Sequence, residues 1–314
     1  MQAEEFPFRT LAPWLRERFG RPVHRVALDA GSTCPNRDGT KGFGGCTYCD
    51  IEGSGTGALK TGASLVEQLE RGLARVARRG DDVGAIAYLQ SYTNTYVDGQ
   101  RFEEVLDAIR PYVEGDRGDV PVVALAVATR PDCLPDETLR SLERLRSVTE
   151  VWLELGLESA NDDVLLAINR LHTVAEFEDA AARAREAGLL TVGHAILGLP
   201  GDGRDGARAT AEALAAAGVE GVKIHHLMVL EKTQMASQYR KGELDVLAPE
   251  TYVDWLADAV ERLRPSQVLH RITGDAPQPK LIAPRWDVAK NRVRELLAAE
   301  LERRGTRQGA LAKG

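Results

Sequence analysis

The chain of 314 residues is long enough for two modest domains or for one α/β barrel with an appendage. Its apolar fraction of 43% and charged fraction of 28% are ordinary for a globular protein, and no run of about 18 apolar residues is present to span a bilayer. The formal net charge of −7 provides no broad positive surface for unspecific nucleic-acid binding. We therefore expect neither a membrane nor DNA as a partner.

The first residues lack the basic start and the long apolar stretch of a secretory signal, so we expect the protein in the reducing cytoplasm. Its four cysteines are Cys34, Cys46, Cys49 and Cys133. In that compartment, a cluster of three cysteines within so short a segment indicates metal binding or redox chemistry rather than disulfides.

Short apolar or β-branched runs alternate with amphipathic stretches of helical length, and this alternation predicts parallel βα units. Six strands are expected, at residues 23–29, 84–90, 122–129, 151–157, 190–197 and 221–229. Six helices are expected between them, at residues 64–79, 102–112, 136–146, 162–169, 174–187 and 205–217. Ser64 and Glu67 have the spacing of a capping box, and Gly188 stands where a helix C-cap is expected.

This pattern predicts an α/β fold, a partial (β/α)6 TIM-like barrel with a C-terminal α+β extension. The expected divisions are a lead-in over residues 1–22, the barrel over 23–231, the extension over 232–304 and a frayed tail over 305–314. Within the extension we expect helices at 249–263 and 287–304 and an extended run at 268–273. By analogy with closed barrels, the active site is expected at the C-terminal ends of the strands.

The strongest motif directly follows the first expected strand, where Cys34, Cys46 and Cys49 have the spacing Cys-x11-Cys-x2-Cys. Three thiolates can bind three irons of a 4Fe-4S cluster and leave the fourth iron open for a substrate or cofactor. The loop also contains glycines that allow the backbone to bend around a compact cluster. These are Gly39, Gly42, Gly44 and Gly45.

Two other interpretations of the cysteines stay open at this point. A Cys-x2-Cys pair is the usual half of a zinc site, and Cys133 or a distant histidine could supply the fourth ligand, although the sequence contains no second pair. A redox dithiol formed by Cys46 and Cys49 would leave Cys34 and the glycines unexplained.

With these motifs the chain resembles the radical S-adenosylmethionine (SAM) superfamily. The loop after the first barrel strand of that superfamily carries three cysteines, the last two as Cys-x-aromatic-Cys, with Tyr48 here. The wider spacing of eleven residues is similar to a bacterial branch related to the catalytic subunit of elongator. The resemblance covers nearly the whole chain and includes further motifs. They lie at residues 92–96, 128–133, 154–159, 197–201, 223–227 and 270–275.

The resemblance implies a radical enzyme with a 4Fe-4S cluster and SAM as cofactors. In the superfamily, an electron from the cluster cleaves SAM, and the 5′-deoxyadenosyl radical that results removes hydrogen from an unactivated C–H bond. An electron donor such as flavodoxin or ferredoxin is implied as a partner. The protein orients these cofactors and excludes water and oxygen.

The resemblance also implies SAM-binding residues at the ends of the second, fourth and fifth strands. They are Gln90 and Ser91, Glu158 and Ser159, and Ile196, Gly198 and Pro200. The first pair replaces the Gly-Gly-Glu that superfamily members commonly use for the methionyl amino group. The second pair resembles positions that bind the ribose or methionyl group, with a polar barrel rim as the alternative. The last three resemble an adenine-binding motif.

Candidate catalytic residues follow the third strand and lie on the sixth. Lys223 and His225 share one face of the sixth strand and His226 takes the other, so only one set can meet the substrate, and the sequence does not decide which. His194 shares a face with Ile196 and is expected to point into the barrel. Arg130 and Cys133 follow the third strand and could reach the cavity. There the Cys133 thiol either donates hydrogen or binds a substrate radical, with an inert buried cysteine as the alternative.

The likeness to the elongator subunit makes a wobble-uridine side chain of tRNA the best single expectation for the substrate. A basic C-terminal stretch from Arg285 onward either contacts this RNA or forms a solvated helix face. A radical SAM enzyme for a small molecule or a protein is the second possibility. The third is a zinc or iron-sulfur binding protein without enzymatic activity.

Overall fold

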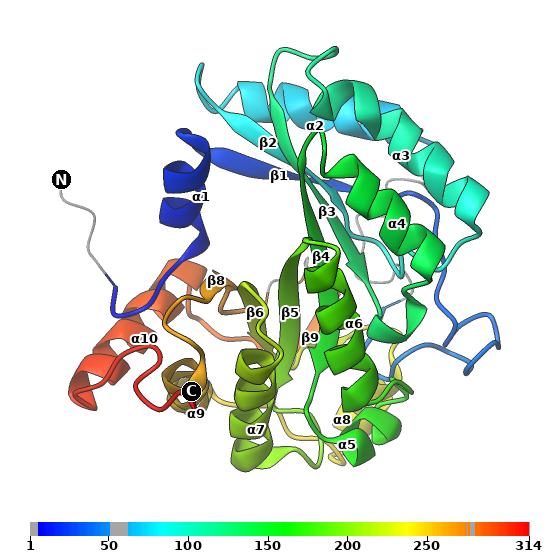
Figure 1. Ribbon diagram of the computed structural model, residues 1–314. Helices are drawn as coiled ribbons and strands as arrows, with labels where there is room; N and C mark the ends of the chain where they lie inside the picture. Colours follow the sequence, from blue (N-terminus) through cyan, green and yellow to red (C-terminus); the bar gives the residue numbers. More distant parts are fainter. Residues whose placement is uncertain (1–5, 51–61, 275, 277–279, 314) are drawn as a thin grey trace.

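The computed structural model describes residues 6–50, 62–274, 276 and 280–313. Seven parallel strands form one curled sheet in the order β1-β2-β3-β4-β5-β6-β8, which confirms the partial barrel (Figure 1). The strands are β1 (Val23–Leu28), β2 (Gly84–Leu89), β3 (Val122–Thr129), β4 (Glu150–Glu158), β5 (Leu190–Leu197), β6 (Gly221–His226) and β8 (Val268–Arg271).

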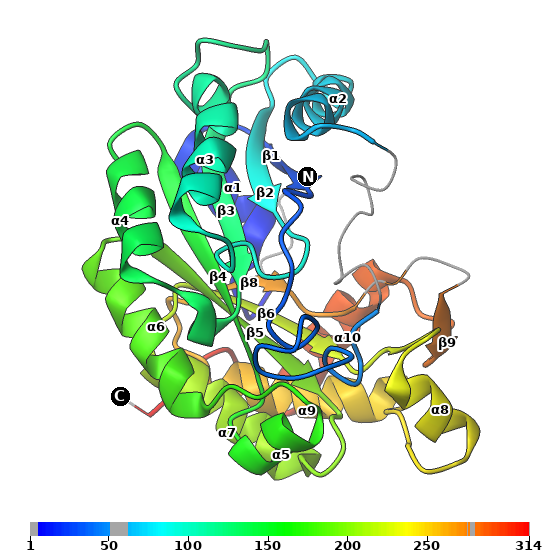
Figure 2. The same cartoon turned by 90° about the vertical axis from the view of Figure 1, so that its right-hand side faces the viewer.

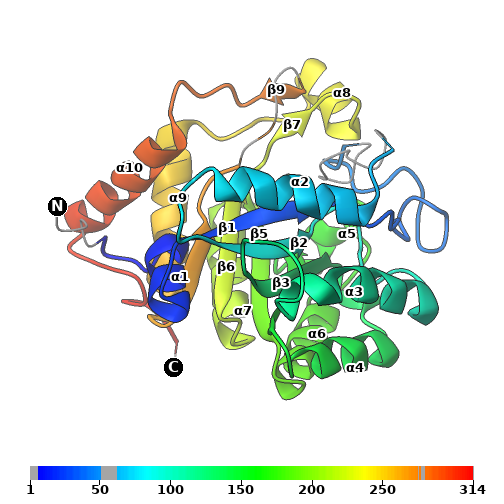
Figure 3. The ribbon, with the colours of Figure 1, turned by 90° about the horizontal axis from the view of Figure 1, so that it is seen from above.

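Helices cover the outer face of the sheet. Seen from above, they form an arc around the strands (Figure 3). The helices are α2 (Leu65–Ala77), α3 (Gly99–Val113), α4 (Asp136–Leu145), α6 (Val174–Glu186), α7 (Gly203–Ala216) and α9 (Pro249–Arg262). Shorter or peripheral helices are α1 (Leu11–Phe19), the 3-10 turn η2 (Pro131–Cys133), α5 (Asp162–Ala167), α8 (Gln234–Arg240) and α10 (Lys290–Arg303). No helix in the described residues has the length and apolarity needed to cross a membrane.

Local sequence signals explain where several of these helices begin and end. Ser64 and Glu67 form the expected capping box at the start of α2. Gly188 follows α6 with a φ of 68°, and its N–H donates to the Arg185 carbonyl in a Schellman-type ending. A Cβ atom at Gly72 of α2 would lie 2.0 Å from the Val26 side chain, so only glycine lets this helix pack closely on β1.

The sheet has one more strand than the six that we expected. β8 lies in the C-terminal extension and pairs in parallel with β6, which makes the extended run at 268–273 part of the barrel. The expected strand at 221–229 ends at His226, and β7 (Val229–Leu230) then pairs in antiparallel fashion with β9 (Leu281–Ala283). This small sheet lies with α8 at one side of the molecule (Figure 2).

Both ends of the chain are packed more firmly than their composition suggests. The lead-in contains α1, which contacts β1 and β8. Residues 305–313, which lie in the expected frayed tail, make hydrogen bonds to distant segments. The backbone N–H of Gln308 donates to the Pro7 carbonyl at 3.0 Å, and the backbone N–H of Leu311 donates to the Glu261 carbonyl at 2.7 Å. Hydrogen bonds to distant segments therefore order a stretch that has few apolar residues.

Candidate functional site

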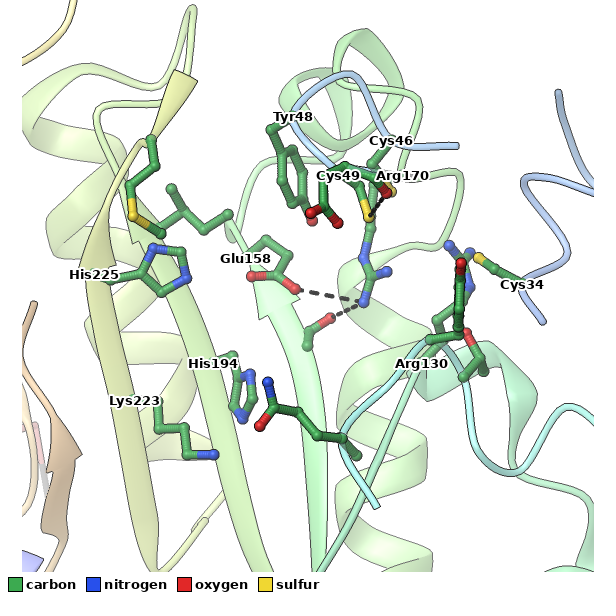
Figure 4. Close-up of a pocket in the computed structure, with 18 of the residues that line it drawn as sticks. Cys34, Cys46, Tyr48, Cys49, Arg130, Glu158, Arg170, His194, Lys223 and His225 are labelled. Atoms are coloured by element: carbon green, nitrogen blue, oxygen red, sulfur yellow. Dashed lines mark hydrogen bonds and ion pairs between the residues drawn. The ribbon is translucent and has the colours of Figure 1, made fainter. Parts of the chain in front are cut away.

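A cavity of about 280 Å³ lies at the C-terminal ends of the strands, the edge where the sequence placed the site. Residues of β2 to β8 and of the loops between them line it together with the loop after β1, which contributes the three motif cysteines. Figure 4 shows Cys34 beside Arg130 on one side, Cys46 and Cys49 at the top, and Lys223 with His225 on the opposite side. The cysteine loop and the sixth strand therefore face one another across a single space.

The cysteine loop is held by the segment that follows α5. The Asn36 amide donates to the Arg170 carbonyl at 3.0 Å and lies 3.8 Å from the Cys46 sulfur. The Asn169 amide donates to the carbonyls of Phe43 and Gly45, at 3.1 and 2.7 Å. These bonds fix a loop that has no regular secondary structure of its own.

The glycines of the loop have the roles that close bending requires. Gly39, Gly44 and Gly45 have φ values of 91°, 78° and 80°, in the region that disfavours side chains. A Cβ atom at Gly42 would lie 2.8 Å from the Leu171 side chain. Conformational freedom is thus needed at three of the four positions, and a close approach explains the fourth.

Five of the predicted cofactor-binding and catalytic residues line the cavity with the cysteines. They are Gln90, Glu158, Ile196, Lys223 and His225. The face of β6 that meets the cavity is thereby settled, because His226 packs on the other side against Tyr252 and Trp286, with ring centroids 5.3 and 4.0 Å away.

The structure places the other predicted residues outside the lining of this cavity. They are Ser91, Ser159, Gly198, Pro200 and Cys133. The Ser159 hydroxyl donates to the Asp202 carboxylate at 2.9 Å, and Ser91 is fully buried. Cys133 lines a second cavity of about 900 Å³, and burial raises the pKa of its thiol to about 12. Its surroundings fit the alternative of an inert buried cysteine.

Two buried arginines lie close to the cysteines, and of these only Arg130 was expected near the cavity, from its place after the third strand. Arg130 is 1% exposed and makes two hydrogen bonds of 2.9 and 2.8 Å to the Asp132 carboxylate. Arg170 donates to the Gly156 carbonyl at 3.1 Å and pairs with Glu158 at 3.5 Å. Within the described residues, Arg130 Nη1 and Arg170 Nε are buried without a hydrogen-bond partner. Both arginines line the cavity, so positive charge surrounds its cysteine end.

The charge of the cavity wall favours an anionic occupant. Six cationic side chains line it, namely Arg37, Arg130, Arg170, Lys223, Arg271 and Lys280. Three carboxylates oppose them, those of Asp50, Glu154 and Glu158. A cluster held by three thiolates is anionic, so this wall fits it electrostatically.

The arrangement of the thiols bears on which metal group they suit. Among the described residues, no group of three histidine, cysteine or acidic side chains is arranged to hold one metal ion. In a cubane cluster each thiolate binds a different iron, so the sulfurs need not converge on one point. Three thiols on one loop, facing one cavity with buried cations, are a donor set that fits the cluster.

The opposite part of the cavity contains an ionic cluster inside the barrel. Glu154 of β4 has no exposed surface and forms an ion pair with Lys223 of β6. The Lys223 ammonium donates to the Tyr88 hydroxyl at 3.1 Å, and His194 Nε2 lies 3.1 Å from the same Glu154 oxygen. Arg25 lies 3.6 Å from the other oxygen of this carboxylate. Barrel interiors are usually filled by branched apolar residues, so these buried charges make the region a candidate functional site.

Burial and mutual pairing set the charges of this cluster. Burial lowers the pKa of Lys223 to about 7, although Glu154 opposes the shift. The Glu154 pKa lies well below its ordinary value because the charges of Lys223 and Arg25 outweigh burial. Burial lowers the pKa of His194 to about 4 and that of His225 to about 3. Both histidines are therefore neutral at pH 7 and present a ring nitrogen that can accept a hydrogen bond.

The sequence contained a signal for part of this cluster. Glu154, Gly156 and Glu158 alternate along an otherwise apolar strand, which places them on one face. Alternation does not show which residue on another strand they meet. The pairing of Glu154 with Lys223 depends on two strand registers, and these are visible only in the structure.

The basic C-terminal stretch is largely used within the protein. Arg304 bonds to Asp258 and Glu261 on α9 at 2.8 and 3.1 Å, and Arg303 pairs with Glu300 at 2.7 Å. The structure therefore favours the interpretation of a solvated, internally paired helix face over that of a free RNA-binding patch.

Two family models match consecutive segments that together cover most of the chain. Residues 33–214 match the model of the radical SAM superfamily, and residues 219–303 match that of the radical SAM C-terminal domain. The uncharacterized protein YtqA of Bacillus subtilis is 39% identical, with 98% of this chain and 96% of the relative covered.

Two of the more distant relatives are considerably longer than this chain. A tRNA uridine(34) acetyltransferase of Dehalococcoides mccartyi is 26% identical over 56% of this chain and 38% of its own length. The structure of archaeal Elp3 from Methanocaldococcus infernus superposes with a TM-score of 0.70 at 19% identity, covering 91% of this chain and 64% of that chain. This likeness establishes a shared fold.

Proposed function

Because the chain belongs to the radical SAM superfamily, we propose that Cys34, Cys46 and Cys49 bind its 4Fe-4S cluster and that the cavity beside them takes SAM. Enzymes of the superfamily use these two cofactors. When bound, the cofactors supply a 5′-deoxyadenosyl radical that removes hydrogen from a C–H bond of the substrate. The observation that carries the proposal is that the three thiols line one cavity with Glu158, Lys223 and His225.

The residues of the chain hold and orient these groups. Gln90 and Glu158 supply polar contacts for SAM, and Ile196 supplies an apolar surface for its adenine. The positive charges of Arg130 and Arg170 offset the negative charge of the thiolates and of the methionyl carboxylate. Ser91, Ser159, Gly198 and Pro200 lie outside the lining of this cavity and help to shape the backbone around it.

We propose a wobble uridine of tRNA as the substrate, reached as an unpaired base. The name of the Dehalococcoides relative supports a tRNA uridine, and the shared fold with archaeal Elp3 is consistent with it. Sequence-specific recognition of RNA usually targets unpaired bases that can leave the stack and enter a pocket. Lys223 and His225 are the candidate catalytic residues that such a base would meet.

We also propose an electron donor and a cellular compartment for the protein. The cluster requires one electron from a donor, for which flavodoxin or ferredoxin is suited. We propose the reducing cytoplasm as the place of action, because three closely spaced cysteines in that compartment suit a metal site rather than disulfides.

Anaerobic reconstitution tests the proposal. The full-length protein should show a reducible 4Fe-4S centre by electron paramagnetic resonance and, with dithionite and SAM, should release 5′-deoxyadenosine. Deletion of the gene should change the wobble-uridine content of cellular tRNA. A protein that binds only zinc would refute the radical chemistry, and an unchanged nucleoside profile would refute the tRNA substrate alone.

A further inference from the structure

The ionic cluster around Glu154 lies at the end of the cavity opposite the cysteines. It is not needed to bind the 4Fe-4S cluster. Glu154, Lys223 and His194 come from three adjacent strands, β4, β6 and β5, and Lys223 and His194 are direct partners in the parallel ladder. Neighbouring strands lie about 4.8 Å apart, so these two side chains start side by side. Both bind the same oxygen of Glu154, which fixes them relative to each other.

Lys223 presents a hydrogen-bond donor at this place. An ammonium group has three N–H donors and no acceptor. Two of the three are taken by Glu154 and by the Tyr88 hydroxyl. The Lys223 ammonium also lies 4.5 Å from the centre of the Tyr88 ring, which limits its movement. One donor remains for a ligand in the cavity that Lys223 lines.

His194 presents a hydrogen-bond acceptor beside it. Its Nε2 atom lies 3.1 Å from Glu154, and a carboxylate can only accept, so Nε2 carries the ring proton. The low pKa of His194, about 4, keeps the second nitrogen unprotonated at neutral pH. No hydrogen-bond partner of Nδ1 is found in the described part of the chain, and His194 lines the cavity.

We propose that Lys223 and His194 recognise the O4/N3–H edge of the substrate uracil. This inference rests on the uridine substrate proposed above and extends it to base selection. The uracil O4 atom accepts from Lys223, and the N3–H group donates to His194 Nδ1. Glu154 is a positioning residue because it fixes both partners.

The same pair excludes cytosine. Cytosine carries an amino group where uracil has O4, and an unprotonated N3 where uracil has N3–H. The Lys223 donor would then face the cytosine amino group, which is also a donor, and the His194 acceptor would face N3, which is also an acceptor. Buried polar groups would be left without partners. Sites built to satisfy a particular hydrogen-bonding edge reject analogues that lack it much more strongly than apolar pockets reject a change of size.

The test measures binding of RNA to the reconstituted holoenzyme under anaerobic conditions with SAM present. Three fluorescent anticodon stem-loop RNAs carry uridine, cytidine or 3-methyluridine at the wobble position, and salt is held constant because phosphate contacts depend on it. For the wild-type protein we expect uridine RNA to bind at least about tenfold more tightly than either of the other two. The wild-type comparison requires no variant to fold.

A substitution at His194 tests whether this residue provides the preference for uridine. His194→Phe, which keeps a ring but has no nitrogen, should bind the three RNAs within about twofold of one another. His226→Phe is the matched control on the opposite face of β6, since it preserves ring stacking on Trp286, and its preference for uridine should persist. Circular dichroism verifies that each variant is folded.

Three results would overturn the inference. Binding of all three RNAs with equal affinity by the wild-type protein refutes base recognition while leaving the RNA substrate intact. Retention of the uridine preference by His194→Phe refutes the role of His194. Absence of binding to every RNA refutes the proposed RNA substrate and, with it, the uracil assignment.

Discussion

Replacing Glu154 by glutamine removes the negative charge at the centre of the barrel's ionic cluster. The change preserves size, but it leaves Lys223 and Arg25 without their carboxylate. Glu154 has no exposed surface and the Lys223 side chain is 3% exposed, so water screens this loss very little. Removal of one partner from a buried ion pair costs about 3–5 kcal/mol of unfolding free energy.

The loss of stability in Glu154→Gln should depend on pH because Lys223 can release its proton. Burial lowers the Lys223 pKa from 10.5 to about 7. The folded protein therefore bears the cost of a buried charged lysine below about pH 7, and this cost is progressively relieved between pH 7 and 10. The Glu154 pKa lies below its ordinary value, so its contribution to stability is present above about pH 4.3 and is lost only on further acidification.

We therefore expect Glu154→Gln to lose the full amount at pH 6 and distinctly less at pH 9, where the wild-type ion pair is already weakened. Urea unfolding followed by circular dichroism at the two pH values gives the difference. The double variant Glu154→Gln/Lys223→Met should recover much of the loss at pH 6, because no unpaired ammonium is buried. Equal losses at both pH values, or additive losses in the double variant, would refute the reasoning.

Three further substitutions test contacts in the barrel, in the cysteine loop and in the C-terminal region. Gly72→Ala should lower stability by about 1–3 kcal/mol through overlap with Val26, and Val26→Ala should relieve most of this loss in urea unfolding. Asn169→Ala should reduce the iron bound after reconstitution more than Asn169→Gly, because alanine disfavours the φ of 56° in addition to losing the amide bonds to the cysteine loop. Arg304→Met should cost about 1.5–3 kcal/mol at pH 7. That loss should shrink as pH falls toward 2, because the pKa of its partner Asp258 is held at about 2 by three arginines and stability from a depressed carboxyl pKa disappears on acidification.

For each of these three substitutions, one result would contradict the expected effect. A Gly72→Ala protein as stable as wild type would show that α2 can move away from β1 at no cost. Equal iron content in the two Asn169 variants would remove the backbone argument. A pH-independent loss in Arg304→Met would assign the effect to packing rather than to charge.

The barrel was predictable because its strands are buried on both faces and therefore appear as apolar runs. β2 is buried along its whole length and shows the pattern clearly. β8 has four residues, two of them His270 and Arg271, so the sequence indicated an extended run there but not a strand of the barrel. Pairing along the edge of β6 defines this strand, and the sequence does not reveal that pairing.

The candidate site was predictable where its residues lie close together in sequence. The three cysteines and their glycines occupy one loop, so spacing alone indicated a metal site. Arg130 follows β3 and Glu154 lies on β4. The importance of Arg130 depends on its burial, and that of Glu154 depends on its burial and on its distant partner Lys223. Cys133 shows the converse case, since its place after a barrel strand suggested the cavity while its side chain lines another one.

The measurement that tests the central claim most directly is the iron and sulfide content of anaerobically reconstituted protein together with its paramagnetic resonance spectrum. We expect about four irons per chain and a reducible 4Fe-4S signal in the wild-type protein and in Cys133→Ala. Cys34→Ala, Cys46→Ala and Cys49→Ala should each lose both. A cluster that survives loss of any one of these three cysteines, or one that requires Cys133, would contradict the assignment.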